Sequence, residues 1–135
     1  MKRWWIIFAD SDAPQLRFLK KGFRHLWIQG YQDGNWISVD LMGNSLDIEL
    51  SHIWLQLPAP PKDDAECAQR EKEIQDSVIA WWKQQGYTAV EVTPRAAGMN
   101  WYCSLMTCVT VAKRFLGIHA PFIQTPHQLY RRLTA

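Results

Sequence analysis

The chain has 135 residues, of which 47% are apolar and 21% are charged, and this composition is typical of a folded domain with a real core. The formal net charge of +2 is small and the Lys and Arg residues are scattered, so we expect no nucleic-acid partner. No apolar run is long enough to span a membrane, and the one that follows Met1-Lys2-Arg3 is too short for a signal peptide. We therefore expect a single domain over residues 1–135, located in the cytoplasm.

The numbers of cysteines and tryptophans predict the redox environment of the protein and the character of its core. Three widely spaced cysteines do not suggest a disulfide framework or a zinc site, so we expect a reducing environment and neither a metal nor a cofactor. Eight tryptophans are unusual for this length. They indicate either a heavily aromatic core or a groove lined by aromatic side chains.

The first half of the chain predicts strands of an antiparallel sheet. We expect strands over residues 4–10, 23–31, 36–42 and 46–57, the last of them ended by Pro58-Ala59-Pro60-Pro61. Residues 11–22 are compatible with either a helical turn or a loop. Asp33-Gly34 predicts a two-residue hairpin turn, because these residues tolerate the positive φ that a type I′ turn requires.

The second half predicts helices and one more strand. We expect a helix over residues 63–85, solvated at first and docked by its second half, and ended by Gly86. A strand over residues 88–93 and a loop over 94–100 follow. Thr107 is expected to cap a short helix that ends at Gly117, and Thr125-Pro126 opens the last helix. The order of elements predicts an α+β fold, an antiparallel sheet with helices packed on it.

Cys108 is the first candidate for chemistry. In the first turn of a helix, free backbone N–H groups and the helix dipole stabilise a thiolate, the form of cysteine that acts as a nucleophile. The alternative is a small core residue, because Cys108 shares a helical stripe with Val111, Ala112 and Phe115. Cys103 is the other candidate for a cysteine at the start of this helix.

The hairpin register brings a histidine and a carboxylate together. A two-residue turn at Asp33-Gly34 pairs residues whose numbers sum to 67, so that Asp40 lies diagonally from His25 and can orient its imidazole. One face of the hairpin then carries His25, Trp27, Gln29, Tyr31, Trp36, Ser38, Asp40 and Met42. The other face carries Leu26, Ile28, Ile37, Val39 and Leu41, and is expected to be a plain hydrophobic core.

Together, a thiolate, an imidazole and a carboxylate have the composition of a cysteine triad. Taken singly, His25 is equally compatible with an ordinary hydrogen-bonded histidine, and Asp40 with a solvated carboxylate near a strand end. The third position of the triad stays open, because Asn35, Ser38 and His52 are also polar candidates.

A family resemblance adds to this interpretation. The order Cys108, Gly117-Ile118, Pro121, Thr125 and Gln128 resembles the cysteine-helix segment of NlpC/P60 domains. There the histidine strand follows the cysteine, whereas here Gly22-Phe23-Arg24-His25 precedes it. That order is similar to circularly permuted NlpC/P60-like proteins with a papain-like fold, including the lecithin-retinol-acyltransferase-like branch, and small phage-associated proteins have similar segments. The resemblance implies Cys108 as nucleophile, His25 as base and Asp40 as the polar third residue.

The function expected from this resemblance is that of a cysteine hydrolase. It would be an amidase, a peptidase or an acyltransferase that works through a thioester on a peptide, amide or acyl substrate. Trp27, Tyr31, Trp36 and Trp101 are the predicted lining of its substrate groove. The alternative is a catalytically inactive member of the same fold, such as a phage assembly component, whose aromatic side chains contact a protein partner.

Overall fold

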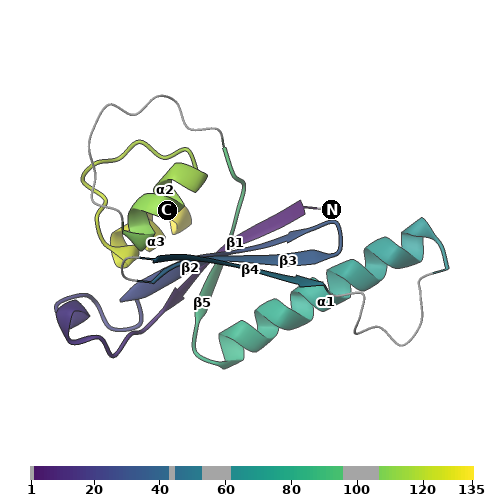
Figure 1. Cartoon of the computed structure of the whole chain (residues 1–135), viewed down its shortest axis with the longest axis horizontal. Helices are drawn as coiled ribbons and strands as arrows, with labels where there is room; N and C mark the ends of the chain where they lie inside the picture. The colour runs from purple at the N-terminus through teal and green to yellow at the C-terminus, as the bar shows by residue number, and fades with distance from the viewer. Residues whose placement is uncertain (1, 43–44, 53–61, 96–106) are drawn as a thin grey trace.

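A computed structural model describes residues 2–42, 45–52, 62–95 and 107–135, and in this part of the chain five strands form one antiparallel sheet (Figure 1). The strands are β1 (Lys2–Ala9), β2 (His25–Gln32), β3 (Asn35–Met42), β4 (Ser45–His52) and β5 (Thr88–Val92), in the spatial order β4-β3-β2-β1-β5. The helices are α1 (Asp64–Gln84), α2 (Cys108–Phe115) and α3 (Pro126–Thr134), with a short 3₁₀ turn, η1 (Pro14–Leu16), after β1. The predicted α+β fold with an antiparallel sheet is confirmed.

The hairpin between β2 and β3 has the predicted register. Asp33 and Gly34 have φ angles of 51° and 83°, as a type I′ turn requires. The paired residues run from Gln32–Asn35 to Ile28–Val39, and each pair of numbers sums to 67. A slip of one residue would have moved every side chain of the hairpin to the opposite face of the sheet.

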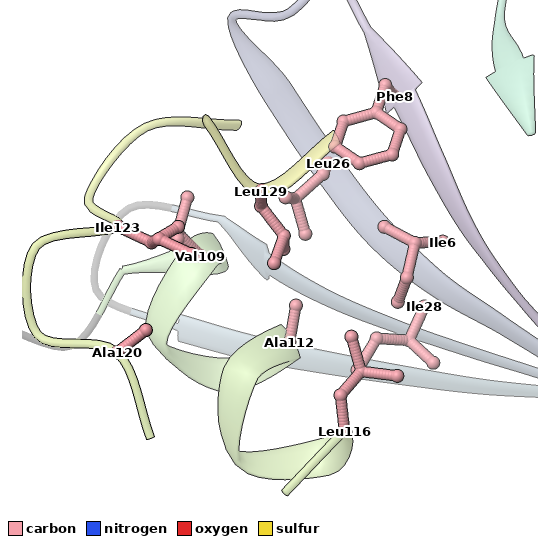
Figure 2. Close-up of a cluster of buried hydrophobic side chains, with 10 residues drawn as sticks. All are labelled: Ile6, Phe8, Leu26, Ile28, Val109, Ala112, Leu116, Ala120, Ile123 and Leu129. Atoms are coloured by element: carbon pink, nitrogen blue, oxygen red, sulfur yellow. The ribbon is translucent and has the colours of Figure 1, made fainter. Parts of the chain in front are cut away.

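Helices cover both faces of the sheet. Figure 1 shows α1 along one face and α2 with α3 on the other. The first core lies between the sheet and the helices α2 and α3, as Figure 2 shows. Its buried members are Ile6, Phe8, Leu26, Ile28, Val109, Ala112, Leu116, Ala120, Ile123 and Leu129.

The second core lies between the sheet and α1. Its buried members are Trp5, Ile7, Tyr31 and Trp36, against which Ile74, Val78, Ile79 and Trp82 of α1 pack. Because β1 is covered on both faces, its residues from Trp5 to Ala9 are all buried. This explains why β1 is a continuous apolar run without polar alternation from Trp4 to Ala9.

The helices begin and end at the residues that the sequence indicated. The side chain of Thr107 accepts a hydrogen bond from the amide of Thr110 at the start of α2. Thr125 and Gln128 form a reciprocal capping box at the start of α3, with a proline at the first helical position. Gly117 has a φ of 64°, so the chain after α2 turns away from the helix through a conformation that favours glycine.

Three expectations need adjustment. Residues 11–22, left open by the sequence, contain η1. β4 ends at His52, and residues 53–57 of the predicted strand lie outside the described residues. Docking of α1 starts earlier than predicted, because Glu71 and Gln75 are already buried in its middle.

Lys113 connects α2 to the loop that follows it. The residue is 4% exposed, and its ammonium group donates hydrogen bonds to the carbonyl oxygens of Ala120 at 2.9 Å and Ile123 at 2.7 Å. Burial lowers the pKa of Lys113. The two carbonyls offset the cost of burying the ammonium group, and they tie the loop to the helix.

We expect Lys113→Met to lower the free energy of unfolding by about 2 kcal/mol, because two buried carbonyl groups lose their donor. Urea denaturation followed by tryptophan fluorescence measures this change. The control is Arg114→Gln at the exposed neighbouring position, which should shift stability by less than about 0.5 kcal/mol. Equal effects of the two substitutions would contradict this role of Lys113.

Candidate functional site

His25 and Asp40 form a hydrogen-bonded pair between neighbouring strands. His25 is the first residue of β2 and Asp40 lies on β3, and His25 Nε2 is 2.7 Å from Asp40 Oδ1. Each side chain is 23% exposed, so the pair is sheltered but reachable from solvent. The contact that the hairpin register predicted is present. Because Asp40 engages Nε2, Nδ1 is the nitrogen of His25 that is left for a second proton partner.

Cys108 is the first residue of α2, and it packs against the first core. Its side chain is partly buried, and the backbone N–H groups of Leu26 and Val109 lie close enough to its thiol to lower the pKa of that group. The Val109 contact belongs to the exposed first turn of the helix, where backbone donors have no partner within the helix. The Leu26 contact joins the helix to β2, one residue from His25.

The sulfur of Cys108 lies where β2 and β3 separate. The residues that flank a two-residue turn form a hydrogen-bonded pair, so the even-numbered residues of β2 direct their N–H groups toward β3. The β2–β3 pairing runs only as far as Ile28–Val39, and beyond it the backbone N–H of Leu26 lies close enough to the Cys108 thiol to lower its pKa. We call this place the strand opening. The His25–Asp40 hydrogen bond spans the same opening.

The imidazole and the sulfur reach the strand opening from different sides. The ring of His25 stacks with that of Trp27 at a centroid distance of 6.3 Å, on the α1 side of the sheet. Cys108 packs with Leu26 and Ile28 on the α2 side. Both groups lie near the strand ends, where β2 and β3 are no longer paired.

Burial raises the pKa of the Cys108 thiol, and this is the largest influence on it. The backbone N–H groups of Leu26, Val109 and Cys108 itself lower the pKa, and the negative charge of Asp40 raises it. The backbone N–H groups at the helix start therefore lower the pKa as expected, but burial raises it by more. The sequence left a helix-start thiolate and a small core residue as alternatives for Cys108, and the raised pKa favours the neutral thiol of the second.

The register separates Asp40 from the other candidates for the third residue. Asn35 pairs with His52 beside the Asp33–Gly34 turn, at the opposite end of β3 from the strand opening. Ser38 pairs with Gln29, in the middle of the ladder. Cys103, the alternative helix-start cysteine, lies outside the described residues.

The prediction that Trp27, Tyr31 and Trp36 line a substrate groove is wrong. Tyr31 and Trp36 are 0% and 7% exposed in the second core, and Trp27 packs edge-on against Trp82 at 5.4 Å. Odd-numbered residues of β2 face α1, whose own aromatic residues cover them, so these side chains are core residues and do not line a groove beside Cys108. The apolar residues in the second half of α1 were the sequence signal for this packing. Trp101 lies outside the described residues.

The described residues contain no group of three or more His, Cys, Asp or Glu side chains placed to hold a metal ion. None of the helices described is both long and apolar enough to cross a bilayer.

No family model, curated protein or solved structure matches this chain.

We expect alkylation of Cys108 by iodoacetamide to reach half its maximal rate above about pH 8.5, the ordinary pKa of a thiol, because burial raises its pKa. Asp40→Asn should lower this midpoint by removing a negative charge that raises the pKa. Tandem mass spectrometry of digests alkylated at a series of pH values locates the modified cysteine. By linkage, the buried neutral thiol stabilises the fold below about pH 8.5, and this contribution is lost as the pH rises through the folded pKa. A midpoint below 8.5, or an upward shift in Asp40→Asn, would contradict this account.

Proposed function

We propose that the protein is a cysteine hydrolase of the circularly permuted NlpC/P60-like, papain-like type, which cleaves an amide or ester through a thioester intermediate. The observation that carries the proposal is the His25–Asp40 hydrogen bond at the strand opening. The thiol of Cys108 lies at the same opening, where the amide of Leu26, the residue next to His25, lowers its pKa. A nucleophile, a base and a group that orients the base are thus contributed by α2, β2 and β3.

In the proposed reaction the Cys108 thiol passes its proton to Nδ1 of His25 as the sulfur attacks the substrate carbonyl carbon. The new S–C bond forms while the bond to the leaving nitrogen or oxygen breaks, and the leaving group takes the proton from the imidazolium. Water then attacks the thioester and gives a proton to His25, which returns it to the sulfur as the acid leaves. Asp40 holds the ring through Nε2 and stabilises the imidazolium. The backbone N–H of Cys108 at the helix start is the proposed donor to the oxyanion.

The raised pKa of the thiol determines how this reaction begins. A neutral thiol cannot act as a preformed ion pair, so His25 works as a general base during the attack. This mode resembles activation of a serine hydroxyl more than that of an already ionised cysteine. The reaction rate is therefore expected to depend strongly on the imidazole of His25.

A second candidate function is that of a catalytically inactive scaffold or assembly component, the fold being kept for contacts with a protein partner. The raised pKa of Cys108 favours it, and so does the approach of the sulfur and the imidazole from different faces of the sheet. The buried Tyr31 and Trp36 are not available to a partner in this case. The two functions differ in one measurable property, which is whether His25 accelerates acylation of Cys108.

We expect p-nitrophenyl acetate to acetylate Cys108 in preference to Cys67, with release of p-nitrophenol followed by slower hydrolysis. His25→Ala should slow acetylation by about a hundredfold or more, the range of general-base catalysis, and Asp40→Asn by a smaller factor. His127→Ala is the matched control, because it removes a histidine on α3, an element that contributes none of the three groups. Stopped-flow absorbance gives the rate, and mass spectrometry identifies the acylated residue.

Two results would refute the proposed hydrolase function and favour the inactive scaffold. One is acetylation of Cys67 at the same rate as Cys108. The other is an equal rate for His25→Ala and His127→Ala in proteins whose circular dichroism spectra show that both are folded.

A further inference from the structure

The chain carries no acidic side chain after Glu91. The basic residues of this last part are Arg95, Lys113, Arg114, Arg131 and Arg132. The acidic residues of the chain therefore all precede α2 and α3, and the exposed charged side chains of these helices, Arg114, Arg131 and Arg132, are basic. A surface of one sign raises the local concentration of ions of the opposite sign.

A pocket of about 410 Å³ opens on this basic part of the molecule. It lies where the end of α2 and the loop after it meet the residues that follow β5 and the last turn of α3. Leu116 and Ile123 are nearly buried and give it an apolar wall. Phe122, which also lines the pocket, is 76% exposed. A volume of this size, with apolar side chains and a few polar groups in its wall, is typical of sites for small molecules.

Arg95 and Arg132 line the same pocket, and both are exposed. The ion pairs among the described arginines engage Arg3, Arg24 and Arg70, and neither arginine of the pocket takes part in them. A guanidinium group presents a planar fork of N–H donors that matches a carboxylate or a phosphate. The pocket therefore combines two guanidinium groups that take no part in these ion pairs with an apolar wall.

We propose that this pocket binds a small organic anion, a carboxylate or phosphate group carried on an apolar body. The anionic group is held by Arg95 and Arg132, and the apolar body lies against Leu116, Ile123 and Phe122. The basic surroundings attract the anion, and the wall adds the contact that a bare inorganic ion would lack. The pocket is separated from the strand opening by the length of α2, about 12 Å for its eight residues. The proposal is therefore independent of the chemistry at Cys108.

The test titrates the full chain with hexanoate, hexyl phosphate, hexanol and inorganic phosphate at constant ionic strength, with the amide resonances of residues 116–120, 122 and 123 as the readout. We expect hexanoate or hexyl phosphate to shift these resonances saturably. Hexanol and inorganic phosphate should bind at least tenfold more weakly, because each lacks one of the two contacts.

Substitutions on α3 give a matched pair. Arg132→Gln should weaken binding of the organic anion about tenfold, because it removes a charged donor. Arg131→Gln removes the same charge one residue earlier, where Arg131 acts on His127 and does not line the pocket, and should leave the affinity unchanged. Both side chains are exposed, so both variants are expected to fold.

Four outcomes would overturn the proposal. If hexanol bound as tightly as the organic anions, the pocket would provide an apolar contact only. If inorganic phosphate bound as tightly as they do, it would be an adventitious ion only. Equal losses in Arg131→Gln and Arg132→Gln would show that the net charge acts without a site. The absence of any shift at millimolar concentrations would show that nothing of this class binds.

Discussion

The register of the β2–β3 hairpin is the constraint on which the rest of the structure depends. Asp33 and Gly34 accept the two positive φ angles of the turn, and this fixes which residues of both strands face α1 and which face α2. Leu26 and Ile28 thereby enter one core, and Tyr31 enters the other. Because the period of a strand is two, no intermediate arrangement exists that would keep part of each core intact.

The same register accounts for the candidate site. It sets Asp40 diagonally across from His25, and it points the amide of Leu26 at the space between the two strands. Asp40 also pairs with Asp47 on β4, so β3 keeps a partner on its other side while it separates from β2. The backbone of the opening is thus held by ordinary sheet pairing on one edge and by a cysteine at the start of a helix on the other. Regular elements position all three candidate groups, so none of them depends on a loop.

Much of the fold could be predicted from local patterns. The turn at Asp33–Gly34, the caps Thr107 and Thr125 and the stop at Gly117 are all decided by short-range chemistry, and the structure confirms each of them. The contact of His25 with Asp40 followed from the turn alone, since a two-residue hairpin leaves one register. These features need no information from distant parts of the chain.

Features that depend on which helix covers which face of the sheet could not be predicted from the sequence. Tyr31 and Trp36 were suited to either a core or a groove, and only the packing of α1 decides between the two. The pKa of Cys108 shows the same limit, because the helix-start amides that lower it are local, whereas the burial that raises it comes from strands more than sixty residues away. The role of Lys113 was also hidden, since a basic residue near the end of a helix is normally solvated.

The closeness of the Cys108 thiol to the amide of Leu26 has a practical consequence for anyone who wishes to capture a ligand in a stable complex. Replacing the cysteine by alanine removes the polar group that faces this amide. Serine retains an acceptor at nearly the same position. A trapping variant of this protein should therefore carry serine at position 108.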